Sequence, residues 1–191
     1  MKRLRNLGSR TGRIQHRLRQ FIETLTAPLR TVAETEAAVY LVGTSGAVSL
    51  EQLFHRMPRA EQRHGLRVCR RLRARGFTAP DLLAAGLLHD AGKIVYPPRL
   101  WERVAVVLLE HYLPIVGRWM AHGYMRAFPF SLPGLDLQQA FRVRRCHPCW
   151  GAKLAANAGA GERTISLIRR HHSTAWFDDE ELAALQDADE A

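Results

Sequence analysis

Apolar residues recur at steps of three and four along most of the chain, and the alternating pattern of a half-buried strand is almost absent. Residues 12–24 show this spacing on a basic background, which predicts an amphipathic helix. Prolines and glycines separate the later apolar runs, as is typical of helix ends. These runs predict helices over residues 31–42, 50–57, 59–76, 81–90, 98–120, 137–146, 148–159, 162–172 and 178–190. The pattern therefore predicts one all-α domain, with residues 122–136 as its longest loop.

Length and composition limit the class of protein. The 191 residues suffice for one domain with a sizeable core. The three cysteines, an odd number, argue against a disulfide framework and for a reducing compartment. The basic start leads into a helical pattern rather than the apolar core of a signal peptide. The most apolar stretch, residues 104–116, is shorter than the ~20 residues of a membrane-spanning helix. We therefore expect a cytoplasmic protein.

Charge is distributed unevenly along the chain. Residues 1–75 contain 16 Lys and Arg but only 5 Asp and Glu, whereas residues 178–191 contain seven acidic residues and no Lys or Arg. A basic N-terminal half can contact an anionic partner such as a nucleotide, a nucleic acid or a lipid headgroup. It can equally be a solvated basic face, and the sequence leaves both interpretations open.

One apolar run ends in residues that are costly to bury. Residues 81–88 lead directly into His89 and Asp90, followed by Gly92 and Lys93. A buried charge must be paired or must bind metal. Other histidines and acids also adjoin apolar helix faces, namely His64, His147, His171, His172, Asp187 and Asp189. Imidazole and carboxylate ligands suit zinc, manganese, iron or nickel, and ligands from several helices can meet in a bundle core. Histidines satisfied within the core are the alternative interpretation.

Five sequence elements occur in an order that resembles a known family. His64 is followed by LLHDAGK (87–93), HPCWGAKL (147–154), ISLIRRHH (165–172) and ALQDADEA (184–191). This order is similar to that of the HD-domain (HDIG-like) metal-dependent phosphohydrolases, over roughly residues 60–191. The resemblance implies an HD-domain helical bundle over residues 49–191, with residues 1–48 as a basic N-terminal helical extension packed on it.

The resemblance also implies roles for individual residues. His64, His89, Asp90 and Asp189 would bind a first divalent ion. Asp187 is the alternative to Asp189, which is preferred because it fills the AD position, and His172 is the alternative to its neighbour His171. His147 and His171 would bind a second ion, and Asp90 would bridge the two. Two such ions (Mn, Fe, Ni or Zn) can share a hydroxide and present it to phosphorus. Lys93 would contact a phosphate oxygen as a point charge, unless it serves only as a cation at a helix end.

The implied function is hydrolysis of a nucleotide-like phosphoester, with a nucleotide or cyclic dinucleotide as the partner molecule. The chain continues after His172 as STAWFDDEE, without the Gly-Tyr-Pro motif of the subfamily that cleaves cyclic di-GMP. Two alternatives remain, a catalytically inactive metal-binding regulatory module and a basic protein that binds nucleic acid or a membrane surface. Cys146 and Cys149 flank His147, and they suit a redox pair or half of a zinc site as well as no function.

Overall fold

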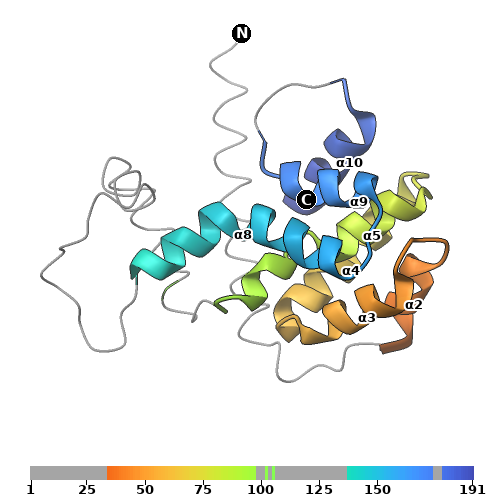
Figure 1. The fold of residues 1–191 in the computed structure, drawn as a ribbon. Coiled ribbons are helices and arrows are strands. Elements are labelled where there is room, and N and C mark those ends of the chain that lie inside the picture. Colours follow the sequence, from red (N-terminus) through yellow and green to blue (C-terminus); the bar gives the residue numbers. More distant parts are fainter. Residues whose placement is uncertain (1–33, 98–101, 103–104, 106–136, 174–177) are drawn as a thin grey trace, which may run out of the picture.

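The computed structural model describes residues 34–97, 102, 105, 137–173 and 178–191. The predicted helix over residues 12–24, most of the one over 98–120 and the loop over 122–136 lie outside these ranges. The described residues form seven α-helices, one short 3-10 helix and no strand, so the predicted all-α class is confirmed for this part of the chain (Figure 1). The elements are α2 (Glu34–Leu41), α3 (Ala47–Arg56), α4 (Arg59–Ala74), α5 (Pro80–Leu88), η2 (Ala91–Ile94), α8 (Leu137–Asn157), α9 (Glu162–Arg170) and α10 (Glu180–Glu190).

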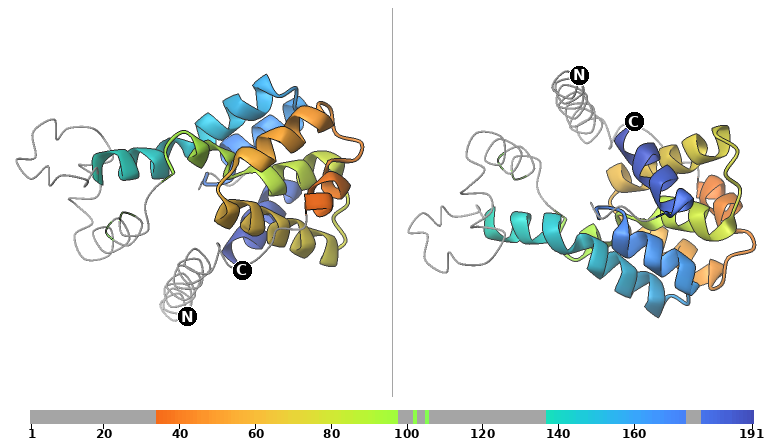
Figure 2. Two further views of the ribbon diagram at one scale, coloured as in Figure 1. Left: turned by 90° about the horizontal axis from the view of Figure 1, so that it is seen from below. Right: turned by 90° about the horizontal axis from the view of Figure 1, so that it is seen from above.

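Helix α5 is the buried centre of the bundle. Every residue from Leu82 to Leu88 is buried, and the helix packs against α2, α4, α9 and α10. A helix that is apolar on all sides is stable only when neighbours surround it, and this sequence has no polar face to turn to water. Helix α10 closes the bundle by packing against α4, α5 and α9 (Figure 2). The end of α5 therefore delivers the next residues of the chain into the interior.

Two glycines let backbones approach closely around this centre. A Cβ atom on Gly65 would lie 2.4 Å from the Leu87 carbonyl oxygen, which brings α4 against α5. A Cβ atom on Gly92 would lie 2.0 Å from the His147 carbonyl oxygen, which brings η2 against α8. Neither distance is compatible with a side chain, so both crossings depend on glycine. The two contacts place His64, His89 and His147 on backbones that touch.

Three predicted helix boundaries were wrong. Helix α3 begins at Ala47 rather than at residue 50, and Gly46 precedes it in the left-handed conformation that glycine adopts readily. Helix α5 ends at Leu88, and η2 follows instead of a continuation to residue 90. Residues 137–157 form one helix with Pro148 inside it, where two helices were expected.

The N-terminal part of the described chain joins the same core. Ala37, Tyr40 and Leu41 of α2 are buried in the cluster that also contains residues of α5 and α10. The division of the chain into residues 1–48 and 49–191 stays a prediction, because residues 1–33 lie outside the described ranges.

Candidate metal centre

Five elements of the bundle bring polar side chains to one buried place. The contributing residues are His64 of α4, His89 and Asp90 after α5, His147 of α8, His171 after α9 and Asp189 of α10. The first five of these residues are between 1% and 4% exposed. The side chain of Asp189 is 15% exposed. His64 and Asp189, which are 125 residues apart in the sequence, thus lie within hydrogen-bond distance of each other.

One group of donor atoms surrounds Asp189 and Asp90. An oxygen of Asp189, Oδ1, lies 2.6 Å from Nε2 of His64 and 3.4 Å from Nε2 of His89. Nε2 of His89 lies 3.6 Å from Oδ2 of Asp90. Neighbouring donor atoms around a transition metal are roughly 3.0–3.4 Å apart when each bond is about 2.1 Å long. The 3.4 Å spacing lies in this range, whereas the 2.6 Å contact of His64 with Asp189 is a hydrogen bond that an ion would have to replace. The donor atoms of His64, His89 and Asp90 all lie within 4.8 Å of one another, so these three residues can hold one metal ion, with Asp189 beside them.

A second group of donor atoms lies on the other side of Asp90. Nε2 of His147 lies 3.3 Å from Nε2 of His171 and 3.4 Å from Oδ1 of Asp90. His172 completes a set of three histidines whose donor atoms lie within 4.8 Å of one another, although His172 itself is exposed. The two oxygens of Asp90 thus face the two groups, Oδ2 toward His89 and Oδ1 toward His147. A carboxylate so placed can bridge two ions.

The ring of His89 is oriented by the backbone. Its Nδ1 donates a hydrogen bond to the Gly86 carbonyl oxygen at 2.9 Å, which directs Nε2 toward Asp90 and Asp189. Within the described part of the chain, this buried Nε2 has no hydrogen-bond partner. A hydrogen bond from one ring nitrogen to a backbone carbonyl is the usual support of a histidine that binds metal through the other. The orphaned nitrogen is therefore evidence that the residues present fit a cation.

The rings of His147 and His171 are held in the same way. Their Nδ1 atoms donate to the carbonyl oxygens of Arg144 at 3.0 Å and Ile168 at 2.7 Å. Because a carbonyl only accepts, the proton of each neutral ring is on Nδ1 and the lone pair is on Nε2. The two Nε2 lone pairs then face each other across 3.3 Å, an arrangement that a cation between them would stabilise.

His64 is held differently from the other three rings. The Arg67 guanidinium donates to Nδ1 of His64 at 3.3 Å, and Nε2 of His64 donates to Asp189 at 2.6 Å. Binding of a metal through Nε2 would move the ring proton to Nδ1 and would replace the contact with Arg67. His64 is therefore in a hydrogen-bonded arrangement that metal binding would change.

Burial and charge set the protonation states of the cluster. Burial alone would lower the pKa of His89, but the Asp90 and Asp189 carboxylates outweigh it and raise that pKa to about 9. Burial lowers the pKa of His147 to about 4 and that of His171 to about 3. Burial would raise the pKa of Asp90, but Lys93 and His89 hold it well below its usual range. Ionised carboxylates and neutral imidazoles are the forms that bind metal. His89 instead carries a proton, because Asp90 and Asp189 favour a positive charge there, and the same two carboxylates would favour a metal cation.

Lys93 adjoins the cluster from η2. Its Nζ lies 2.6 Å from Oδ2 of Asp90 and 3.1 Å from Oε2 of Glu61 in the first turn of α4. Glu61 is only 4% exposed, and the sequence analysis did not single it out. Its position three residues before His64 on one helix was the available signal, because residues so spaced share a face.

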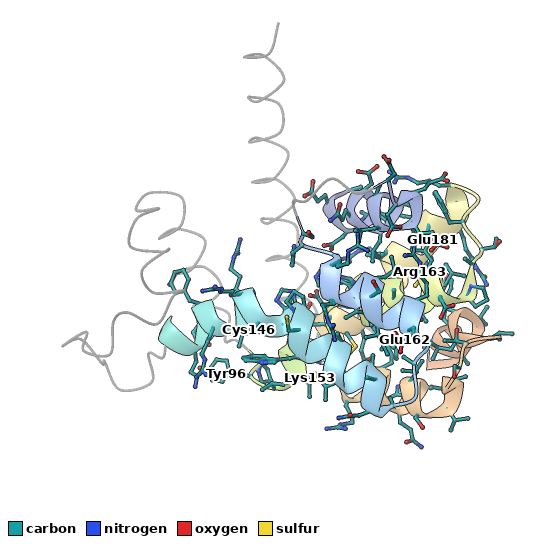
Figure 3. The ribbon with its side chains drawn as sticks, turned by 45° about the horizontal axis from the view of Figure 1, so that its top comes forward. Tyr96, Cys146, Lys153, Glu162, Arg163 and Glu181 are labelled. Atoms are coloured by element: carbon teal, nitrogen blue, oxygen red, sulfur yellow. The ribbon has the colours of Figure 1, made fainter. Side chains whose placement is uncertain are left out.

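The remaining predicted residues lie apart from the cluster. The Asp187 side chain is 75% exposed and pairs with Arg75 at 3.7 Å, so Asp189 and not Asp187 faces the histidines. Cys146, labelled in Figure 3, is half-buried on α8, and Cys149 is exposed on the same helix. Neither belongs to the two metal-competent groups among the described residues. The predicted functions of this cysteine pair stay predictions.

Comparison with models of known protein families, with curated proteins and with solved structures gave no match to this chain. None of the described helices combines the length and the apolar character needed to cross a membrane. The class that the geometry of the described residues defines is accordingly an all-helical fold with two adjoining, largely buried groups that can hold metal ions, one of His and Asp side chains and one of three histidines.

Proposed function

We propose that the protein is a metal-dependent phosphohydrolase or phosphodiesterase of the HD-domain type that acts on a nucleotide-like phosphoester. The observation that carries the proposal is the position of Asp90, whose two carboxylate oxygens face two separate groups of histidines. A single structural ion would need only one such group. The order of His64, His89, Asp90 and Asp189 along the chain, which resembles the HD-domain family, supports the same reading.

Each side chain has a definite task in this proposal. His64, His89 and Asp189 would hold one divalent ion, His147 and His171 would hold a second, and Asp90, whose two oxygens face the two groups, would serve both. Two ions at such a site supply Lewis-acid activation of water and neutralise charge on phosphoryl oxygens. Lys93, whose side chain is 21% exposed, donates hydrogen bonds to a phosphate oxygen of the substrate. Burial of the ligands excludes bulk water and strengthens these interactions.

The test is hydrolysis of a generic phosphodiester and a phosphomonoester by purified protein supplied separately with manganese, iron(II), nickel and zinc. We expect turnover with at least one metal, and loss of at least about 100-fold in kcat/KM in Asp90→Ala and in Asp189→Ala. Asp187→Ala is the matched control, since Asp187 is an exposed carboxylate two residues away on the same helix. It should keep the activity of the parent.

The alternatives give different results in the same experiment. Bound metal without turnover of model esters or of a panel of cyclic dinucleotides would favour the metal-binding regulatory module. Equal activity of the parent and Asp90→Ala would show a contaminating enzyme and would contradict the proposal.

A further inference from the structure

Glu61 is a buried carboxylate to which the proposed reaction assigns no task. It lies in the first turn of α4 and is 4% exposed. Its Oε2 lies 3.1 Å from Nζ of Lys93. An acid in the first turn of a helix stabilises that helix through the helix dipole. That effect is available at the surface, however, and does not require a carboxylate in the interior.

The ammonium of Lys93 lies between two carboxylates, and only one of them is a metal ligand. Nζ is 2.6 Å from Oδ2 of Asp90, the oxygen that also faces His89. A divalent ion on Oδ2 would compete for that oxygen and would repel the nearby ammonium. Glu61, the second carboxylate in contact with Lys93, is not part of either metal-competent group. Metal binding therefore leaves the contact of Glu61 with Lys93 in place.

The backbone fixes this arrangement independently of the metal. Gly65, one turn after Glu61, brings α4 into contact with the α5 backbone, and Gly92, next to Lys93, brings η2 into contact with α8. The carboxylate and the ammonium are thus placed by helices whose crossings tolerate little movement.

We infer that Glu61 is a positioning residue that retains the Lys93 ammonium at the site when metal occupies Asp90, so that Lys93 remains directed at a phosphate oxygen of the substrate. The inference rests on the proposed function. Under this inference the two carboxylates have different roles. Asp90 binds metal, and Glu61 holds the Lys93 ammonium that metal would displace from Asp90.

Nuclear magnetic resonance of the lysine side chains tests the contact without activity. The chain contains three lysines, Lys2, Lys93 and Lys153, so spectra of protein labelled at lysine Cε are simple. Lys153 is exposed on α8 and serves as an internal control (Figure 3). The two Hε protons of a held lysine give separate signals, whereas those of a freely rotating one average. Each protein is measured without metal and with saturating zinc, whose binding is followed by calorimetry.

We expect separate Hε signals for Lys93 in the parent protein in both states. In Glu61→Gln they should remain separate without zinc, because Asp90 still holds the ammonium, and should average when zinc binds. Averaged signals in the zinc-bound parent, or separate signals in zinc-bound Glu61→Gln, would overturn the inference. Glu61→Asp, which keeps the charge on a shorter side chain, should give an intermediate result and is used if Glu61→Gln does not fold.

Kinetics then distinguish positioning from a structural role. Glu61→Gln should lower kcat/KM roughly tenfold in the parent and less than about twofold in Lys93→Ala, since Glu61 acts through Lys93. Equal losses in both backgrounds would show a structural role and contradict the inference. Glu162→Gln is the matched control, because Glu162 is an exposed first-turn acid of α9 (Figure 3). Zinc binding without turnover would refute the proposed function alone, while absence of zinc binding would refute the metal site itself.

Discussion

Pro148 has an unexpected position beside a candidate metal ligand. Proline lacks the N–H that would bond the carbonyl four residues earlier, which in α8 belongs to Arg144. That carbonyl instead accepts the hydrogen bond from Nδ1 of His147 at 3.0 Å. Because Pro148 has no N–H to bond the Arg144 carbonyl, this carbonyl can accept the hydrogen bond from His147. That bond fixes the ring proton on Nδ1 and leaves Nε2 for metal. A residue that is unfavourable for the helix is in this way favourable for the site.

Pro148→Ala should therefore change stability and metal affinity in opposite directions. We expect the free energy of unfolding to rise by about 1–3 kcal/mol, because a helical hydrogen bond is restored and alanine has the higher helix propensity. Metal affinity should fall by about 10-fold, the lower end of the effects seen when the support of a histidine ligand is altered. Chemical denaturation and calorimetric zinc titration measure the two quantities.

Pro80→Ala is the control for this prediction. Pro80 begins α5, where proline removes no helical hydrogen bond, so metal affinity should be unchanged. An unaltered zinc affinity in Pro148→Ala would show that the second acceptor of His147, the Val143 carbonyl oxygen at 3.1 Å, is sufficient.

At the scale of single helices, the start of α10 depends on one carboxylate. Oδ1 of Asp179 accepts the backbone N–H of Leu182 at 3.1 Å and thereby caps the helix. The same carboxylate accepts two hydrogen bonds from Arg163 and one from Arg170. Arg163 also bonds Glu181 on α10, beside which it lies in Figure 3. These arginines and acids line a surface hollow to which none of the histidines contributes. Asp179 thus connects α9 to the start of α10 through its hydrogen bonds.

Stability should consequently fall at low pH through Asp179. The hydrogen bond from Arg163 lowers the pKa of Asp179 from 3.8 to about 2. A carboxyl whose pKa is lower in the folded than in the unfolded protein stabilises the fold above the unfolded value, and this contribution disappears as the pH falls toward the folded value. We expect a loss of about 1–2 kcal/mol between pH 5 and pH 2, allowing for solvent screening of partly exposed Arg163.

The measurement is thermal unfolding of the parent and Asp179→Asn across this pH range. Asparagine retains the cap but not the charge, so the variant should be less stable at pH 5 and should show a smaller decrease toward pH 2. Asp187→Asn, at an exposed carboxylate, should follow the parent. Parallel pH profiles for the parent and Asp179→Asn would rule out this source of acid sensitivity.

Helix prediction from sequence succeeded where local pattern dominates. The apolar spacing identified α4, α9 and α10 close to their observed bounds. It failed around Pro148, where the predicted break does not occur and α8 continues from Leu137 to Asn157. The reason is tertiary: α8 packs on η2 and α9, and these contacts outweigh the cost of an interior proline. The residues of a segment set its preference for or against a helix, and the packing contacts of that segment decide whether the folded protein follows this preference.

At the scale of the whole molecule, the candidate centre joins helices that are distant in sequence. Residues of α4, α8 and α10 meet with those that follow α5 and α9, so two ions bound there would together connect five parts of the chain. Without an ion, the cluster is held by hydrogen bonds and by the positive charges of Lys93 and His89. We therefore expect bound metal to change the free energy of unfolding of the whole fold.

Saturating zinc or manganese should raise the free energy of unfolding. A ligand that binds the folded state at 100 times its dissociation constant adds about 2.7 kcal/mol. We expect a clear increase in melting temperature that a chelator reverses, that Asp90→Ala abolishes and that Asp187→Ala retains. Thermal scans against metal concentration provide the measurement. An increase of equal size in Asp90→Ala would place the metal elsewhere.

The amino-acid sequence alone was sufficient to identify the all-helical class, the buried apolar run that ends at His89 and most of the candidate metal ligands. Helical periodicity and the cost of burying charge are local properties, readable from residue order alone. Folding was needed to add Glu61 and Arg67, and to give Pro148 a part in orienting His147. Assignments such as the contact of Glu61 with Lys93 depend on distances between residues far apart in the chain. Such distances arise only when helices cross, and here the crossings depend on glycine contacts that no helical periodicity reveals.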